Sequence, residues 1–167
     1  MWDLADLRDR ERINEQLGKD GAEGLVLAAE ALLKRGHPGG RPALAFFVPG
    51  RVEVLGKHTD YAGGRSLVAA TDRGFSLVVL PRGDSHLDLV DAARQRCHDF
   101  ALSRDAEAEP GDWTCYPAAV VRRLARNFPA KDGRPELLGA DVAFVSNLPS
   151  AAGMSSSRTT APSGSPQ

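Results

Sequence analysis

The sequence predicts an α+β fold in which helices pack to one side of a mixed or antiparallel sheet. The first forty residues carry leucine and alanine at helical spacing. From Arg41 onward, short apolar or alternating runs follow one another and are separated by glycine and proline, as strands and turns are. Strands that follow one another directly, with helices grouped apart, favour α+β over a doubly wound parallel sheet.

The first forty residues are predicted to form two helices. The first has a weak apolar stripe at Leu4, Leu7, Ile13 and Leu17. The second ends at Gly36 and Pro38, both of which oppose a helix. Its expected stripe consists of Leu25, Ala28, Ala29, Leu32 and Leu33. Both helices need only a packing role.

The central part of the chain is predicted to form most of the sheet. Residues 44–48 and 52–55 are expected as two strands joined by a turn at Pro49-Gly50. Residues 61–66 are expected as a loop, followed by the apolar stretch 67–70 and a strong strand at 75–80. The segments around Leu87 and over 97–102 alternate as an antiparallel pair of strands would.

The C-terminal third is predicted to contain one helix, one strand and a loop. The helix is expected to begin near Pro117, because proline is favoured in a first helical turn. Its expected buried stripe is Val120, Val121, Leu124, Ala125 and Phe128. Val142 and Phe144 mark a last strand that Asp141 is expected to cap, and small residues then form a loop over 149–157.

Composition restricts the class of protein and of partner. A chain of 167 residues is long enough for one core. Its 21 Lys and Arg balance 22 Asp and Glu to a net charge of -1, which opposes nucleic-acid binding because that requires a basic surface. No apolar run approaches the roughly 18 residues of a membrane span, and the N-terminus lacks the pattern of a secretory signal. We therefore expect no nucleic acid or membrane partner and a cytoplasmic location.

The segment 49–64, with the sequence PGRVEVLGKHTDYAGG, carries more polar and small residues than packing needs. Alternation places Arg51 and Glu53 on one side of a strand, which then leads to Lys57, His58 and Asp60 within one turn. A carboxylate accepts hydrogen bonds from two sugar hydroxyls, and a neighbouring histidine or lysine donates to another oxygen. Taken alone, the same residues are also typical of a solvated, charged turn.

The segment 148–157, with the sequence LPSAAGMSSS, is the second candidate for chemistry. If a helix began at Ser155, its free backbone N–H groups and its positive dipole end would bind an anion such as phosphate. Taken alone, a serine-rich loop is also typical of a flexible turn.

Together the two segments resemble the galactokinase branch of the GHMP kinases. Pro-Gly-Arg-Val at 49–52, Gly56, His-Thr-Asp-Tyr at 58–61 and Gly64 are similar to the galactokinase signature. Residues 148–157 are similar to the phosphate-binding loop of the family. The resemblance covers about residues 10–157 and implies the α+β fold of the N-terminal domain of these kinases.

The resemblance also implies roles for individual residues. Arg51 is expected to be catalytic, because a permanently charged guanidinium stabilises negative charge at the reacting phosphate. Lys57, His58, Thr59 and Asp60 are expected to bind the sugar. The residues expected to bind the phosphates of ATP are Ala151, Ala152, Gly153, Met154, Ser155, Ser156 and Ser157. Ser157 is also expected to ligate Mg²⁺, which prefers oxygen donors.

The implied reaction is transfer of the γ-phosphoryl of ATP to a sugar hydroxyl, with the C1 hydroxyl of galactose expected. Glu53 stands where the family has Asn, and Lys57 where it has Glu, so both bear on which sugar is bound. The alternative is a non-catalytic sugar- or nucleotide-binding module related to galactokinase.

The resemblance predicts a division into N-terminal helices at 1–40, a sugar- and ATP-binding domain at 41–157 and an irregular tail at 158–167. The tail is rich in Pro, Gly and Ser where the family continues as a helix. The family's catalytic Asp and C-terminal domain have no counterpart after it. The hypothesis is therefore an incomplete kinase that is inactive alone.

Overall fold

A six-stranded mixed sheet forms the centre of the computed structural model, which describes residues 1–17, 19, 21–56, 59–128 and 137–149. In the order β1-β2-β3-β6-β4-β5, β4 and β6 run parallel and the other neighbouring pairs are antiparallel. The strands are β1 (Trp2–Asp3), β2 (Pro42–Leu55), β3 (Leu67–Pro81), β4 (His86–Asp91), β5 (Arg96–Ala101) and β6 (Ala140–Ser146). The predicted antiparallel pair is confirmed as β4 and β5.

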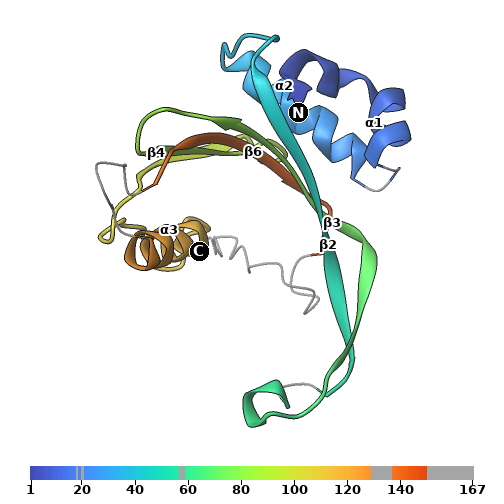
Figure 1. The fold of residues 1–167 in the computed structure, drawn as a ribbon, viewed down its shortest axis with the longest axis vertical. Helices are drawn as coiled ribbons and strands as arrows, with labels where there is room; N and C mark the ends of the chain where they lie inside the picture. Colours follow the sequence, from blue (N-terminus) through green and yellow to red (C-terminus); the bar gives the residue numbers. More distant parts are fainter. Residues whose placement is uncertain (18, 20, 57–58, 129–136, 150–167) are drawn as a thin grey trace, which may run out of the picture.

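Helices cover both faces of this sheet (Figure 1). One face carries η1 (Leu4–Arg8), α1 (Arg10–Leu17) and α2 (Ala22–Lys34), and the other carries α3 (Cys115–Asn127). On β3, Val78 and Leu80 join the core under α2, whereas Leu77 and Val79 pack on the side of α3. The predicted α+β class is confirmed, but the expectation that all helices lie on one side is wrong, because β3 is apolar on both faces.

The core beneath α2 follows the predicted helical stripe. Leu25, Ala28, Ala29 and Leu32 are fully buried, together with Leu4 and Leu7 of η1. The first predicted helix is divided in two at Asp9. Its carboxylate accepts hydrogen bonds from the backbone N–H groups of Glu11 (3.0 Å) and Arg12 (3.1 Å), so Asp9 caps a new helix, α1.

The stripe predicted for the third helix is only partly correct. Val121 and Ala125 are buried with Ala118, but three of the expected core residues are exposed, namely Val120, Leu124 and Phe128. The buried row includes two alanines, which bring α3 close to the large side chains of the sheet, including Leu89 and Phe100. The exposed apolar residues Val120, Leu124 and Phe128 form a second row along α3 and its C-cap, adjacent to the buried one.

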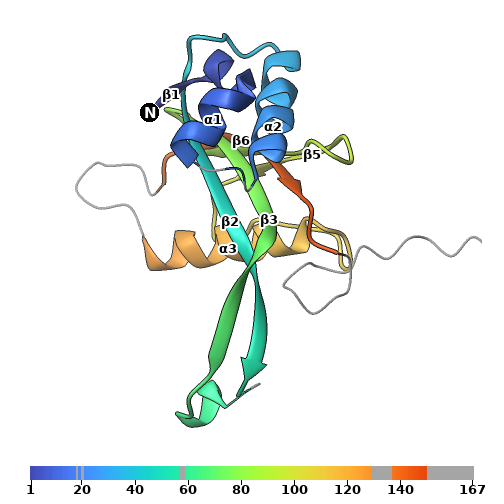
Figure 2. The same cartoon turned by 90° about the vertical axis from the view of Figure 1, so that its right-hand side faces the viewer.

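The strands β2 and β3 are longer than predicted and form an arm. The expected turn at Pro49-Gly50 is wrong: residues 44–48 and 52–55 belong to one strand, as do 67–70 and 75–80. Pro49 pairs with Gly74 and Arg51 with Ala70, so Gly50 alone faces residues 71–73 in a bulge. Beyond the bulge the two strands leave the body as a twisted ribbon that ends at η2 (Asp60–Ala62) (Figure 2). We call residues 51–70 the arm.

Candidate functional site

The arm carries most of the first predicted segment away from the core. Its strands pair Arg51 with Ala70, Val52 with Ala69 and Glu53 with Val68. Residues 51–55 and 67–70 are exposed along their whole length. The ladder of backbone hydrogen bonds, rather than burial, therefore holds this part together.

Arg51 stands at the base of the arm with its side chain exposed. Within the part of the chain that the structure describes, its guanidinium has no hydrogen-bond or ion-pair partner. A guanidinium without a carboxylate partner keeps its five donors and its full charge for an anionic ligand.

The end of β6 lies against the base of the arm. The Asn147 carboxamide oxygen accepts a hydrogen bond from the Gly74 backbone N–H at 2.8 Å. Leu148 is 9% exposed, and a Cβ placed on Gly50 would lie 2.5 Å from its Cδ2 atom. A side chain at position 50 would therefore require the Leu148 side chain to shift. The chain that leads into the second predicted segment is therefore fixed beside the residue that precedes Arg51.

The tip of the arm contains the turn that was expected to bind a sugar. Thr59 is exposed and forms hydrogen bonds within the tip, and Asp60 begins η2. Lys57 and His58 lie outside the described residues, as do the predicted phosphate-binding residues 151–157, including Ser157. The structure thus places Arg51, Thr59 and the backbone of Asp60 on one arm.

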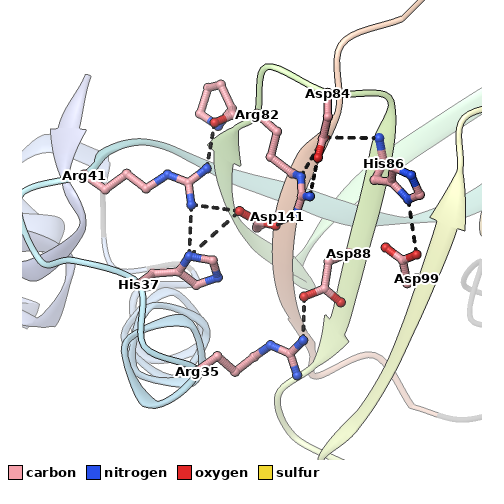
Figure 3. Close-up of polar contacts among 10 residues, drawn as sticks. Arg35, His37, Arg41, Arg82, Asp84, His86, Asp88, Asp99 and Asp141 are labelled. Carbon is pink, nitrogen blue, oxygen red and sulfur yellow. Dashed lines mark hydrogen bonds and ion pairs between the residues drawn. The ribbon is translucent and has the colours of Figure 1, made fainter.

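A buried carboxylate cluster at the other end of the sheet was not predicted (Figure 3). Asp141 lies within β6 and is 2% exposed, so the expectation that it caps the strand is wrong. Its two oxygens accept hydrogen bonds from Arg41 (2.8 Å) and Arg82 (2.6 Å). Arg41 also contacts Nδ1 of His37 at 2.9 Å. A carboxylate between apolar neighbours in a strand is the sequence signal for such a pairing, because an aspartate is buried almost only when paired.

The charges of this cluster compensate one another. Arg82 also binds Asp84, and this hydrogen bond lowers the pKa of Asp84 to about 2. Hydrogen bonds to Asp84 and then to Asp141 raise the pKa of Arg82. Nearby, Arg35 binds Asp88 at 2.5 Å, and this hydrogen bond raises the pKa of Arg35. Because each of these arginines forms an ion pair with an aspartate, we assign the cluster a role in stabilising the fold.

Other candidate ligands also have structural partners. His86 contacts Asp99 on the neighbouring strand at 3.3 Å. Trp113 packs 5.9 Å from Phe144, measured between ring centroids, in the core under α3. No three His, Cys, Asp or Glu side chains gather as a metal-binding group among the described residues. In the same part of the chain, every helix is too short or too polar to cross a membrane.

Comparison with known proteins assigns this arrangement to a family. A family model for the galactokinase galactose-binding signature matches residues 36–81, which include β2, η2 and β3. The chain is 36% identical over 113 residues to the galactokinase of Halalkalibacterium halodurans, a match that covers 67% of this chain. These matches support a galactokinase-branch segment. The chain is also 35% identical over 124 residues, 72% of its length, to the galactokinase of Streptococcus mutans.

The structural comparison agrees on the galactokinase fold. The crystal structure of Lactococcus lactis galactokinase complexed with galactose matches with a TM-score of 0.56 at 20% sequence identity, over 88% of this chain and 32% of that one. The chain spans 27% of the length of the Halalkalibacterium halodurans relative and 30% of that from Streptococcus mutans. The galactokinase match therefore concerns one part of these longer proteins.

Proposed function

We propose that the chain forms the sugar-binding and phosphate-binding part of a galactokinase-type ATP:sugar phosphotransferase. The observation that carries the proposal is the place of the galactose-binding signature. It spans residues 36–81, which include the whole arm, and the end of β6 lies against the base of that arm. The arm thus carries both Arg51 and the turn proposed to hold the sugar, and the chain that leads into the proposed phosphate-binding loop passes beside its base.

In this proposal Arg51 is the catalytic residue at the base of the arm. The γ-phosphoryl of ATP is transferred to a sugar hydroxyl, with the C1 hydroxyl of galactose as the expected acceptor. Negative charge on the transferred group is stabilised by positioned cations. The exposed guanidinium, which has no partner among the described residues, supports this role.

The tip of the arm is the proposed sugar site, which spans Lys57, His58, Thr59 and Asp60, with the direct contacts assigned to Lys57, His58 and Asp60. Asp60 would accept hydrogen bonds from two sugar hydroxyls, because an ionised carboxylate has only acceptors. Lys57 and His58 would donate to other oxygens of the sugar. The proposed domain is 41–157, with the helices of 1–40 packed on its sheet and 158–167 as a tail.

Residues 151–157 are the proposed binding loop for the phosphates of ATP. The small side chains of six of these seven residues, all except Met154, would leave backbone N–H groups accessible to phosphate oxygens. Ser157 would provide a hydroxyl oxygen for Mg²⁺, in keeping with the oxygen ligands that this ion prefers. When bound, Mg²⁺ neutralises charge on the phosphates, and the chain's own residues orient the two substrates.

Transfer of residues 1–157 onto the remaining part of the Halalkalibacterium halodurans galactokinase tests this proposal. We expect ADP release with galactose in a panel of sugars, and a decrease of about 10²–10³-fold in the Arg51→Ala variant. Arg126→Ala, which changes an exposed arginine on α3, is the matched control and should keep the rate. Turnover no higher than that of the Arg51→Ala variant would contradict the proposal.

The unfused chain is expected to bind galactose without turning it over, because phosphoryl transfer needs several parts at once. Calorimetry with galactose and with ATP separately measures binding, and ADP release from the fused protein then distinguishes the kinase from the binding module. A galactose signal that Asp60→Ala abolishes, combined with no ADP release from the fused protein, would favour the module.

A further inference from the structure

The hydrogen bonds at the tip of the arm converge on one residue, Thr59. Its backbone N–H donates to the Gly56 carbonyl at 3.1 Å. Its own carbonyl accepts from the N–H groups of Ala62 (3.1 Å) and Gly64 (2.8 Å). The backbone of Thr59 therefore connects both sides of the turn.

The hydroxyl of Thr59 is also used inside the tip. Its Oγ1 lies 2.7 Å from the Gly56 carbonyl oxygen and 3.1 Å from that of Arg65. A hydroxyl has one proton to donate, so the two carbonyls share it. Ser66 donates its own hydroxyl to the Gly56 carbonyl at 2.9 Å. Side-chain hydrogen bonds thus hold the incoming strand to the outgoing one.

Two glycines make this arrangement sterically possible. Gly56 has a φ of 84°, and a Cβ on it would lie 2.4 Å from the Arg65 carbonyl oxygen and 2.9 Å from Oγ1 of Thr59. A Cβ on Gly64 would lie 2.8 Å from the Cβ of Thr59. The backbone therefore closes tightly around Thr59 from two directions.

Packing does not hold the tip in place. Tyr61 is 82% exposed, and Leu55 and Leu67 at the ends of the strands are 67% and 55% exposed. None of the described side chains from Leu55 to Leu67 is buried, so the hydrogen bonds of the turn are its main described contacts. Thr59 stands in the sequence between Lys57-His58 and Asp60, next to the residues proposed to contact the sugar.

We propose that Thr59 is the positioning residue of the sugar site: its hydroxyl orders the turn for its neighbours and does not itself bind the sugar. This inference rests on the proposed function. It also separates the role of Thr59 from those of Lys57, His58 and Asp60. Ser66 would support the same turn from the outgoing strand.

The test uses the full chain and two substitutions at one position. Thr59→Val keeps the shape but removes the hydroxyl, and Thr59→Ser keeps the hydroxyl. Galactose affinity is measured by calorimetry, and amide hydrogen exchange is measured over residues 56–66. We expect Thr59→Val to weaken binding about tenfold and to speed exchange at the tip, because net hydrogen-bond energies of this size change an equilibrium constant about tenfold. Thr59→Ser should keep both values close to those of the parent chain.

Ser66→Ala provides a second, independent variant. It should speed exchange over the tip and weaken galactose binding in the same direction as Thr59→Val. If Thr59→Val weakens binding while exchange stays unchanged, the hydroxyl is a direct sugar ligand and the proposal is wrong. If Thr59→Val changes neither measurement, the proposal is wrong as well.

The two proposals fail in different ways. If the parent chain binds no galactose, the assignment of the arm as a sugar site fails. Hydrogen exchange then decides the ordering role of Thr59 by itself: unchanged exchange in Thr59→Val rejects that role, and faster exchange supports it.

Discussion

The body of the chain and its arm are built on different physical principles. In the body, helices on both faces bury the sheet, and the buried carboxylate of Asp141 is bound by two arginines. In the arm, residues 51–55 and 67–70 are exposed, and hydrogen bonds close the tip around Thr59. Stability should therefore depend on the body and sugar binding on the arm, and substitutions should separate the two.

The largest loss of stability is expected from Asp141→Ala. The substitution leaves the guanidinium groups of Arg41 and Arg82 without their buried partner, and breaking such a pair costs about 3–5 kcal/mol. Urea unfolding measures this loss. Galactose affinity of the folded protein should be unchanged, because the cluster lies at the opposite end of the sheet from the base of the arm. A loss below about 1 kcal/mol would show that the cluster does not stabilise the body.

A comparable but smaller loss is expected from the core beneath α2. Leu32 is fully buried, so Leu32→Ala should lower the free energy of unfolding by about 2–5 kcal/mol through lost burial and the cavity left behind. Leu27, on the same helix, is 45% exposed and serves as the control. Leu27→Ala should change stability by about 0.5 kcal/mol or less. Equal effects at the two positions would argue against the described packing of α2.

Arg51→Ala should reduce activity without lowering stability, the opposite of what is expected for Asp141→Ala. It removes an exposed side chain that has no partner within the described residues, so the urea midpoint should stay where it is. The fused enzyme should nevertheless lose most of its turnover. A large drop in the midpoint would mean that Arg51 supports the fold of the arm and would weaken its assignment as catalytic.

The smallest effect is expected at Asp84 and depends on pH. The hydrogen bond from Arg82 lowers the pKa of Asp84 from its ordinary value of 3.8 to about 2. The ionised carboxylate therefore adds stability above pH 3.8, and this contribution is lost as the pH falls toward 2. Asp84→Asn should be slightly less stable than the parent at pH 7. Thermal melts from pH 7 to pH 2 should show the difference shrinking, and a difference at pH 2 as large as that at pH 7 would contradict this origin.

Patterns in the sequence predicted the body better than the arm. The stripe of α2 and the pair β4–β5 were predictable because burial imposes a regular spacing of apolar residues. Val120 and Leu124 were assigned to the core incorrectly, because apolar residues on α3 also lie on its exposed side. The continuity of β2 through Pro49-Gly50 was missed, since a bulge and a turn have the same local composition.

The candidate site was predicted by motif, and its geometry was not. The resemblance identified Arg51 and the turn at 57–60, but spacing alone does not reveal that Thr59 ties Gly56 to Arg65. It also does not reveal that Gly50 admits Leu148 beside the arm. Both contacts depend on how the backbone folds between the residues that they join, and local sequence patterns do not determine that path.

Mapping galactose binding residue by residue tests the separation of body and arm most directly. A titration of the isotope-labelled chain with galactose, followed by amide NMR shifts, should perturb residues 51–66 and leave the amides of α1 and α2 unchanged. Saturable shifts confined to the arm are the predicted result. Shifts centred on the helices and the Asp141 cluster, or no saturable shifts at all, would contradict the account.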